Sequence, residues 1–333
     1  MMPLGKHDRR PYTCPMSSPV LFAVACLIWG STFWAITLQL GDVPPAVSVV
    51  YRFALAAAVL FAWCKVRGDS LRLPWRAQRW TIIQGCATFG ISYICTYTSE
   101  QYLVSALVAV LFALMVFWTP ILNRMILGTP LSPRTWVAGT VSVIGVILLF
   151  WQSIGSAVRE ILAGGDGHFL LGLILALAAT VASTVGNVLV VKVREQESNV
   201  LLTMAWAMLW GTLLVTSWTV ATGQPFVLPA TARYWGGLLY LSLFGSVIAF
   251  ACYFTLIDRI GSGKAVYIGV VTPVISVLLS MRLENFRPGV IECLGMLLCL
   301  ASVAWALRAP APAQVRKAVA ESEPEPELLK KAS

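Results

Sequence analysis

The sequence predicts an all-α integral membrane protein with ten transmembrane helices, arranged as two inverted five-helix repeats around a central cavity. Three observations lead to this prediction. Of the 333 residues, 58% are hydrophobic and only 12% are charged, whereas about a quarter are charged in an average soluble domain. The mean hydropathy of +0.78 places most of the chain in lipid. Ten apolar runs follow one another, and the last five repeat features of the first five.

A membrane helix needs about 20 mostly apolar residues, and this length divides the chain into spans and connections. Residues 1–18 are expected to form a cytoplasmic tail. Met16 stands where translation would be expected to start, just before the first span, and residues 1–15 would then be an upstream extension of the reading frame. The first repeat covers 19–151, a linker 152–168 and the second repeat 169–307, and a disordered cytoplasmic tail covers 308–333. The expected spans are 19–39, 46–66, 79–99, 103–123, 134–151, 169–191, 200–220, 234–257, 265–281 and 289–307.

The two halves share residues at a nearly constant offset. Phe89-Gly90 recurs 155 positions later as Phe244-Gly245, and Thr119-Pro120 recurs 153 positions later as Thr272-Pro273. Because each half has five spans, an odd number, the second half must be inserted upside down relative to the first. Inverted repeats are typical of secondary transporters, whose substrate site lies between the repeats near the middle of the bilayer. This arrangement predicts alternating access.

Positive charges predict the orientation, because Lys and Arg collect on the cytoplasmic side. Of the 24 Lys and Arg residues, 19 lie on one face of the predicted topology and 4 on the other, and Arg52 lies within a span. Both termini are therefore expected in the cytoplasm of a multi-pass protein of the bacterial inner membrane. The net charge of +9 needs no nucleic acid to explain it. The expected partners are the lipid bilayer and a small-molecule substrate, and a homodimer stays open.

Enzyme and cofactor chemistry finds little support in the sequence. The eight cysteines include no C-x-x-C pair, and the only histidines are His7 and His168, so no metal site or cofactor is expected. No Gly-x-x-x-x-Gly-Lys-Ser/Thr motif for ATP is present. We therefore expect no catalytic residues. A channel or sensor module, and an integral membrane enzyme, remain as alternatives to a transporter.

Arg52 is the most informative single residue. It is the seventh residue of its expected span, and an arginine at the centre of a membrane helix costs at least about 2.5–3.5 kcal/mol. One interpretation is a cation that binds a substrate or gate carboxylate. The other is a structural arginine that extends towards water or ties two helices together. An arginine with several tyrosines favours a neutral or zwitterionic solute that bears a carboxylate.

Polar and aromatic residues recur at helical spacing in several other spans. Lipid offers no hydrogen bonds, so these faces should point inwards, where they either line a cavity or join helices. Both interpretations stay open. The cavity candidates besides Arg52 are Trp29, Gly30, Ser92, Tyr93, Thr96, Tyr97, Thr184, Asn187, Tyr253 and Tyr267.

Two prolines and two glutamates complete the candidate set. Pro120 and Pro273 each lack an amide hydrogen, so they are expected to act as static kinks or as hinges. Glu100 and Glu292 are the acidic residues nearest to the lipid. Each is a candidate for proton coupling, with simple solvation at a helix end as the alternative.

Six short motifs stand out along the chain: Ile28-Trp29-Gly30-Ser31-Thr32-Phe33, Tyr51-Arg52-Phe53, Ser105-Ala106, Thr119-Pro120, Thr272-Pro273 and Leu283-Glu284. Together they resemble the EamA branch of the drug/metabolite transporter superfamily. The resemblance covers about residues 19–307, and it implies ten helices, two repeats, a central cavity and transport of small metabolites, often export of amino acids or related compounds. One departure is Thr129, where the family usually has an acidic residue.

Overall fold

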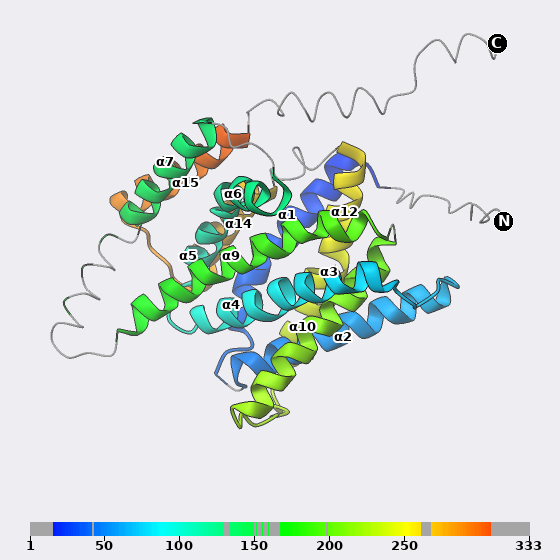
Figure 1. Ribbon diagram of the computed structural model, residues 1–333. Helices are drawn as coiled ribbons and strands as arrows, with labels where there is room; N and C mark the ends of the chain where they lie inside the picture. The colour runs from blue at the N-terminus through cyan, green and yellow to red at the C-terminus, as the bar shows by residue number, and fades with distance from the viewer. Residues whose placement is uncertain are drawn as a thin grey trace, which may run out of the picture.

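The computed structural model describes residues 16–41, 43–128, 133–149, 151, 155, 159, 167–197, 199–260 and 268–307, and all regular structure in these ranges is helical (Figure 1). Two of the helical segments, η1 and η2, are π-helices. The first half contains α1 (Ser18–Thr37), α2 (Pro45–Val66), α3 (Trp75–Gly85), η1 (Cys86–Ser92), α4 (Tyr93–Ser99), α5 (Ser105–Phe112), α6 (Met115–Leu127) and α7 (Pro133–Leu149). The second half contains α9 (His168–Arg194), α10 (Val200–Ala221), α11 (Ala232–Leu239), η2 (Tyr240–Ile248), α12 (Ala249–Ile260), α14 (Ile268–Leu283) and α15 (Val290–Leu307).

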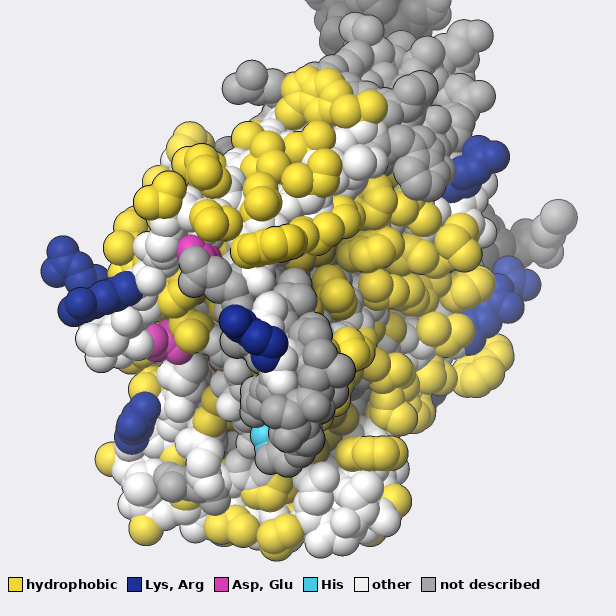
Figure 2. All heavy atoms as spheres, turned by 90° about the vertical axis from the view of Figure 1, so that its left-hand side faces the viewer, with side chains coloured by type: hydrophobic (Ala, Val, Ile, Leu, Met, Phe, Trp, Pro, Cys, Tyr) yellow, Lys and Arg dark blue, Asp and Glu magenta, His cyan; other side chains and the backbone are white. Residues whose placement is uncertain are grey.

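The surface and the helix lengths are those of a membrane protein. Hydrophobic side chains cover much of the face in Figure 2, and Leu27, Ile174 and Leu297 are each more than 60% exposed. In the described part of the chain, five helices are long and apolar enough to cross a membrane, or six if the bent pair α5 and α6 is one span. Ten spans were expected. The difference arises partly because α7, α14 and α15 contain shorter apolar stretches.

The two halves have matching elements. Both ends of α10 lie 155 positions after the corresponding ends of α2. Phe89-Gly90 lies within η1 and Phe244-Gly245 within η2, so the repeated dipeptide marks a π-helical stretch in each half. Corresponding helices also contact corresponding partners in the opposite half. Helix α2 contacts η2, and its counterpart α10 contacts η1. Helix α1 contacts α14, and its counterpart α9 contacts α6.

The helices run between two ends of the bundle. At one end, which we call the Glu100 end, the ring of Tyr102 stacks on that of His168, which begins α9. At the opposite end, which we call the Arg194 end, α9 finishes and Asn199 donates a hydrogen bond to Asp69 after α2. A polar site near one of these ends can therefore differ in access from a site near the other.

Small residues bring the helices of the two halves into close contact. A Cβ added to Gly211 of α10 would lie 2.7 Å from Cβ of Phe89 and 2.8 Å from the carbonyl oxygen of Gly85. A Cβ added to Gly145 of α7 would lie 2.8 Å from the amide nitrogen of Cys299 in α15. Such contacts are expected between membrane helices, because close approach of backbones supplies packing energy that lipid cannot.

The two prolines lie inside helices, Pro120 in α6 and Pro273 in α14. The pair α5 and α6 is bent by 44° at a break before Pro120. The hydroxyl of Thr119 donates to the carbonyl oxygen of Met115 at 2.6 Å, one turn earlier. Thr129 lies outside the described residues.

Candidate functional site

Arg52 is buried, with 1% of its surface exposed. Its Nε donates to the hydroxyl of Ser246 at 3.1 Å, and one terminal nitrogen donates to the hydroxyl of Tyr97 at 3.3 Å. The guanidinium also lies 4.7 Å from the ring centre of Tyr93 and 5.1 Å from that of Phe53. All of these partners are neutral. Among the described residues, no carboxylate lies within hydrogen-bonding distance of this cation.

Local structure explains why the guanidinium fits there. Arg52 projects from α2 towards η2, where Gly245 leaves room for it, since a Cβ on Gly245 would lie 3.2 Å from a terminal nitrogen of the arginine. The hydroxyl of Ser246 donates to the carbonyl of Leu241 five residues earlier, a π-helical spacing. The Gly-Ser pair therefore provides both the space and a hydrogen-bond acceptor.

A chain of hydrogen bonds continues from Arg52 to the Glu100 end. Tyr97 is completely buried, and its hydroxyl donates to Oε1 of Gln39 at 2.9 Å. Gln39 is also completely buried, and its Nε2 has no hydrogen-bond partner. A buried donor without a partner costs about 1–3 kcal/mol, so this amide marks a place where an acceptor would be stabilised.

Two carboxyl groups lie beyond this chain. Glu100 follows the last residue of α4 and is 6% exposed, and neither of its oxygens has a hydrogen-bond partner. Burial raises the pKa of the Glu100 carboxyl well above its usual range, the charge of Glu284 raises it further, and Arg52 lowers it. Glu284 is bound differently, because it accepts a hydrogen bond from the hydroxyl of Ser105, which also bonds Ser280. The alternative of a simply solvated acid is therefore wrong for Glu100.

Five aromatic rings, which we call the aromatic layer, lie next to Arg52 on its other side: Trp29, Phe53, Phe89, Tyr93 and Phe250. The centre of the Phe53 ring is 5.1 Å from that of Phe89 and 4.6 Å from that of Tyr93. Phe250 joins the layer at 5.6 Å from Phe89 and 5.1 Å from Trp29. Phe53 and Tyr93 contact the guanidinium, whereas Phe89 and Phe250 face a pocket.

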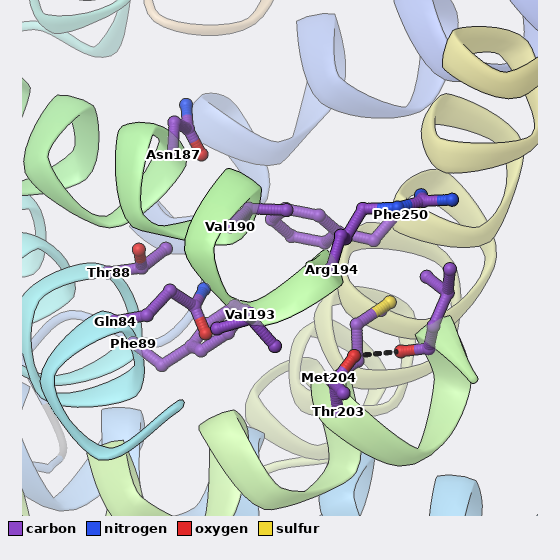
Figure 3. Close-up of a pocket in the computed structure, with 11 residues that line it drawn as sticks. Gln84, Thr88, Phe89, Asn187, Val190, Val193, Arg194, Thr203, Met204 and Phe250 are labelled. Atoms are coloured by element: carbon purple, nitrogen blue, oxygen red, sulfur yellow. Dashed lines mark hydrogen bonds between the residues drawn. The ribbon is translucent and has the colours of Figure 1, made fainter. Parts of the chain in front are cut away.

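This pocket lies between the aromatic layer and the Arg194 end (Figure 3). It contains about 450 Å³ of empty space, part of it open to solvent. The side chains leave room for only about one water molecule. The pocket must therefore widen to admit a solute. Its lining residues are Gln84, Thr88, Phe89, Asn187, Val190, Val193, Arg194, Val200, Thr203, Met204 and Phe250.

The structure divides the predicted cavity residues into three groups. Trp29, Tyr93 and Tyr97 lie around Arg52 or in the aromatic layer, and the ring centre of Tyr253 lies 5.2 Å from that of Trp29, with the two rings tilted. Asn187 lines the pocket. The third group packs or bonds between and within helices instead: Gly30 lies against Ile275, Ser92 donates to Ala179, Thr96 to Ser92 and Thr184 to Thr180.

Two other predicted residues stand apart from Arg52. Glu292 lies in the first turn of α15, where a negative charge is favourable to the helix dipole. Tyr267 lies outside the described residues. No cluster of three His, Cys, Asp or Glu side chains that could hold a metal occurs in the described ranges.

Several residues of this region were not predicted from the sequence, among them Gln39, Gln84, Arg194 and Phe250. Gln84 lies four positions before Thr88, so its place on the polar face of its span was a usable signal. Arg194 ends α9 and could not be told from the other positive charges that mark helix ends. Phe250 carries no distinguishing signal among so many apolar residues.

Comparison with known proteins agrees with the sequence motifs. A family model described as the EamA-like transporter family matches residues 16–151 and residues 170–308. The chain is 27% identical to the uncharacterized inner membrane transporter YedA of Escherichia coli K12, over 83% of this chain and 85% of YedA. It is 27% identical to the uncharacterized transporter YvbV of Bacillus subtilis, over 78% of this chain and 82% of YvbV.

A solved crystal structure supports the fold. It aligns with a TM-score of 0.61 at 19% sequence identity, over 87% of this chain and 96% of the solved chain. Identity at this level supports the fold and nothing finer.

Proposed function

Because this chain belongs to the EamA-like transporter family, we propose that it is a secondary transporter that exports a small carboxylate-bearing solute, an amino acid or a related compound, by alternating access. The resemblance carried by the short motifs of the sequence is confirmed by the family match. The substrate class, the direction of transport and the alternating-access mechanism are our proposal.

The single observation that carries the substrate class is the environment of Arg52. A fully buried guanidinium that bonds only hydroxyl groups keeps a positive charge with no neutralising partner. A charge without a counterion is expensive in a dry interior. A solute carboxylate would supply that counterion, and the unpartnered amide of Gln39 would offer a second donor nearby.

Alternating access is supported by the unequal closure of the two ends. The pocket is partly open and lies on the Arg194 side of the aromatic layer, with Phe89 and Phe250 in its lining. Beyond the layer, Arg52, Tyr97 and Gln39 are buried. A solute in the pocket would reach Arg52 only if the rings moved. This arrangement favours a carrier with one side closed over a continuous channel.

The proposed architecture has ten spans, with both termini in the cytoplasm of a bacterial inner membrane. Support comes from the 155-residue offset between α2 and α10, from the exchanged packing of the halves and from the two segments matched by the family model. YedA is named as an inner membrane transporter, which supports the same membrane here. The excess of positive charge at one side supports the orientation.

The test is growth of bacteria that express the protein, compared with empty vector, on toxic amino-acid analogues, nucleoside analogues and cationic drugs. We expect protection against the amino-acid analogues that is abolished or strongly reduced by Arg52→Ala at equal membrane abundance. Arg233→Ala removes an exposed arginine from the start of α11 and should protect like the unmodified protein. Protection against analogues without a carboxylate, unchanged in Arg52→Ala, would overturn the proposal.

A further inference from the structure

Like Arg52, Glu100 is a buried ionisable group that has no oppositely charged hydrogen-bond partner among the described residues. Its two oxygens are buried and accept no hydrogen bond, although hydroxyl and amide donors are present at the same end of the bundle. Burial of an ionised carboxylate without hydrogen bonds is too costly to persist. This geometry favours the protonated form of Glu100 over the ionised form.

The charged and titratable groups near Glu100 come from several elements. Arg52 of α2 and Glu284, which follows α14, act on its charge in opposite directions. Tyr97 lies on its own helix, one turn earlier, and hydrogen-bonds Arg52. His168 of α9 stacks on Tyr102, two residues after Glu100. Glu100 is thus a buried acid whose charge is affected by one cation, Arg52, and by one further acid, Glu284.

We propose that Glu100 is a proton-binding site of the transporter, and that its protonation leaves Arg52 able to accept the carboxylate of the solute. The inference rests on the proposed function, because it assumes that Arg52 binds a carboxylate. It adds the coupling ion and the residue that carries it.

The chemical step is the gain and loss of one proton. A proton from solvent adds to the carboxylate of Glu100 and gives the neutral acid, with no other bond made or broken. When the solute leaves Arg52, the acid releases that proton and the resulting carboxylate becomes the counterion of the guanidinium. The transporter therefore binds the proton at Glu100 and the solute at Arg52 in the same state. Outward movement requires a solute gradient steep enough to carry the proton, which suits relief of an accumulated metabolite.

Infrared spectroscopy tests the proton site without any substrate. The purified full chain in liposomes is titrated with base while the C=O stretch of protonated carboxyl groups is recorded. We expect one band that persists far above about pH 4.3, where an unperturbed Glu titrates. Glu100→Gln should remove it. Glu195→Gln, at an exposed acid that pairs with Lys192, should leave it in place.

Two outcomes would overturn the proton site: absence of a persistent band, or a band that survives Glu100→Gln. A band removed by Glu292→Gln instead would assign the proton to that residue and would equally overturn it. If Glu100→Gln does not fold, neighbouring substitutions still decide. Glu284→Gln should move the midpoint of the band to lower pH, and Arg52→Gln should move it to higher pH. An unchanged midpoint in both variants contradicts the proposal.

The same preparations separate this inference from the proposed function. Transport that depends on Arg52, without a persistent carboxyl band, would remove the proton site and leave the carboxylate exporter intact. A persistent band in a protein whose Arg52→Ala variant still transports normally would keep the proton on Glu100 and remove its link to the solute.

Discussion

The environment of Arg52 explains how one membrane-embedded cation is tolerated. Two ring faces and two hydroxyl groups surround the guanidinium. A ring face contributes about 0.5–2 kcal/mol and a hydrogen bond to a charged group about 1.5–3 kcal/mol. Together these interactions exceed the insertion cost of an arginine, about 2.5–3.5 kcal/mol on translocon scales. The site can therefore stay folded without an anion while still favouring one.

Tyr97 provides a prediction at this scale. Tyr97→Phe removes one hydroxyl that serves both Arg52 and Gln39, while keeping the buried ring. We expect export to fall by about 10-fold or more, the kinetic equivalent of losing a hydrogen bond of about 1.5 kcal/mol to a charged group. The measurement is efflux of the protected analogue at equal protein abundance. Tyr240→Phe, which removes a hydroxyl bonded to Ser31, is the matched control and should change efflux little.

Single residues were predictable where the amino-acid type conflicts with lipid. Arg52, Tyr93 and Tyr97 stand out from the sequence for this reason, and the structure brings them together. The burial of Glu100 was not predictable, because a carboxylate just after a span normally meets water. Its surroundings depend on Glu284, which is 184 positions away in the chain. Only the tertiary fold shows that these two glutamates, far apart in the sequence, lie near each other in space.

The existence of most helices followed from hydropathy, but their internal breaks did not. The span expected at 200–220 is α10, Val200–Ala221, whereas the single span expected at 79–99 divides into α3, η1 and α4. Hydropathy reports which residues avoid water and says nothing about the hydrogen-bond register within a helix. The repeated Phe-Gly was visible in the sequence, yet its meaning as a π-helical stretch was not.

Helix contacts yield a second prediction. Gly211→Ala would place a Cβ 2.7 Å from that of Phe89 and 2.8 Å from the Gly85 carbonyl oxygen, so α10 must move away from η1. Overpacking of this kind costs about 1–3 kcal/mol. We expect a lower melting temperature of the solubilised protein, measured by the loss of its monodisperse fraction on heating. Gly236→Ala has nothing within 4 Å and should melt at or above the original temperature. An unchanged Gly211→Ala protein would contradict the close packing.

At the scale of the whole molecule, the two halves have matching helices, but their charged side chains differ. At the 155-residue offset that relates α2 to α10, the position of Arg52 corresponds to Ala207, and that of Glu100 to Thr255. Both charged groups therefore belong to the first half, while Ser246 and Glu284 come from the second. Residues from both halves of the chain therefore surround Arg52 and Glu100, as the proposed alternating access between two repeats requires.

Orientation provides the third prediction. With both termini in the cytoplasm, alkaline phosphatase fused after Gly223 should be active and fused after Gly68 inactive, because the enzyme folds only outside the inner membrane. Green fluorescent protein fused after residue 307 should fluoresce. The two glycines end α10 and α2 in left-handed turns, so each fusion follows a complete span. Active phosphatase after Gly68 would reverse the proposed orientation.

The aromatic layer has an electrical consequence. Once the pocket widens and fills with water, the membrane voltage falls mainly across the dry stretch from Phe250 to Glu100. An elementary charge that crosses the whole voltage gains or loses about 2.3 kcal/mol per 100 mV. A zwitterionic amino acid that crosses alone carries no net charge, whereas one that crosses with the proton of Glu100 carries one positive charge. A current that accompanies the solute is therefore the signature of paired movement across the dry stretch.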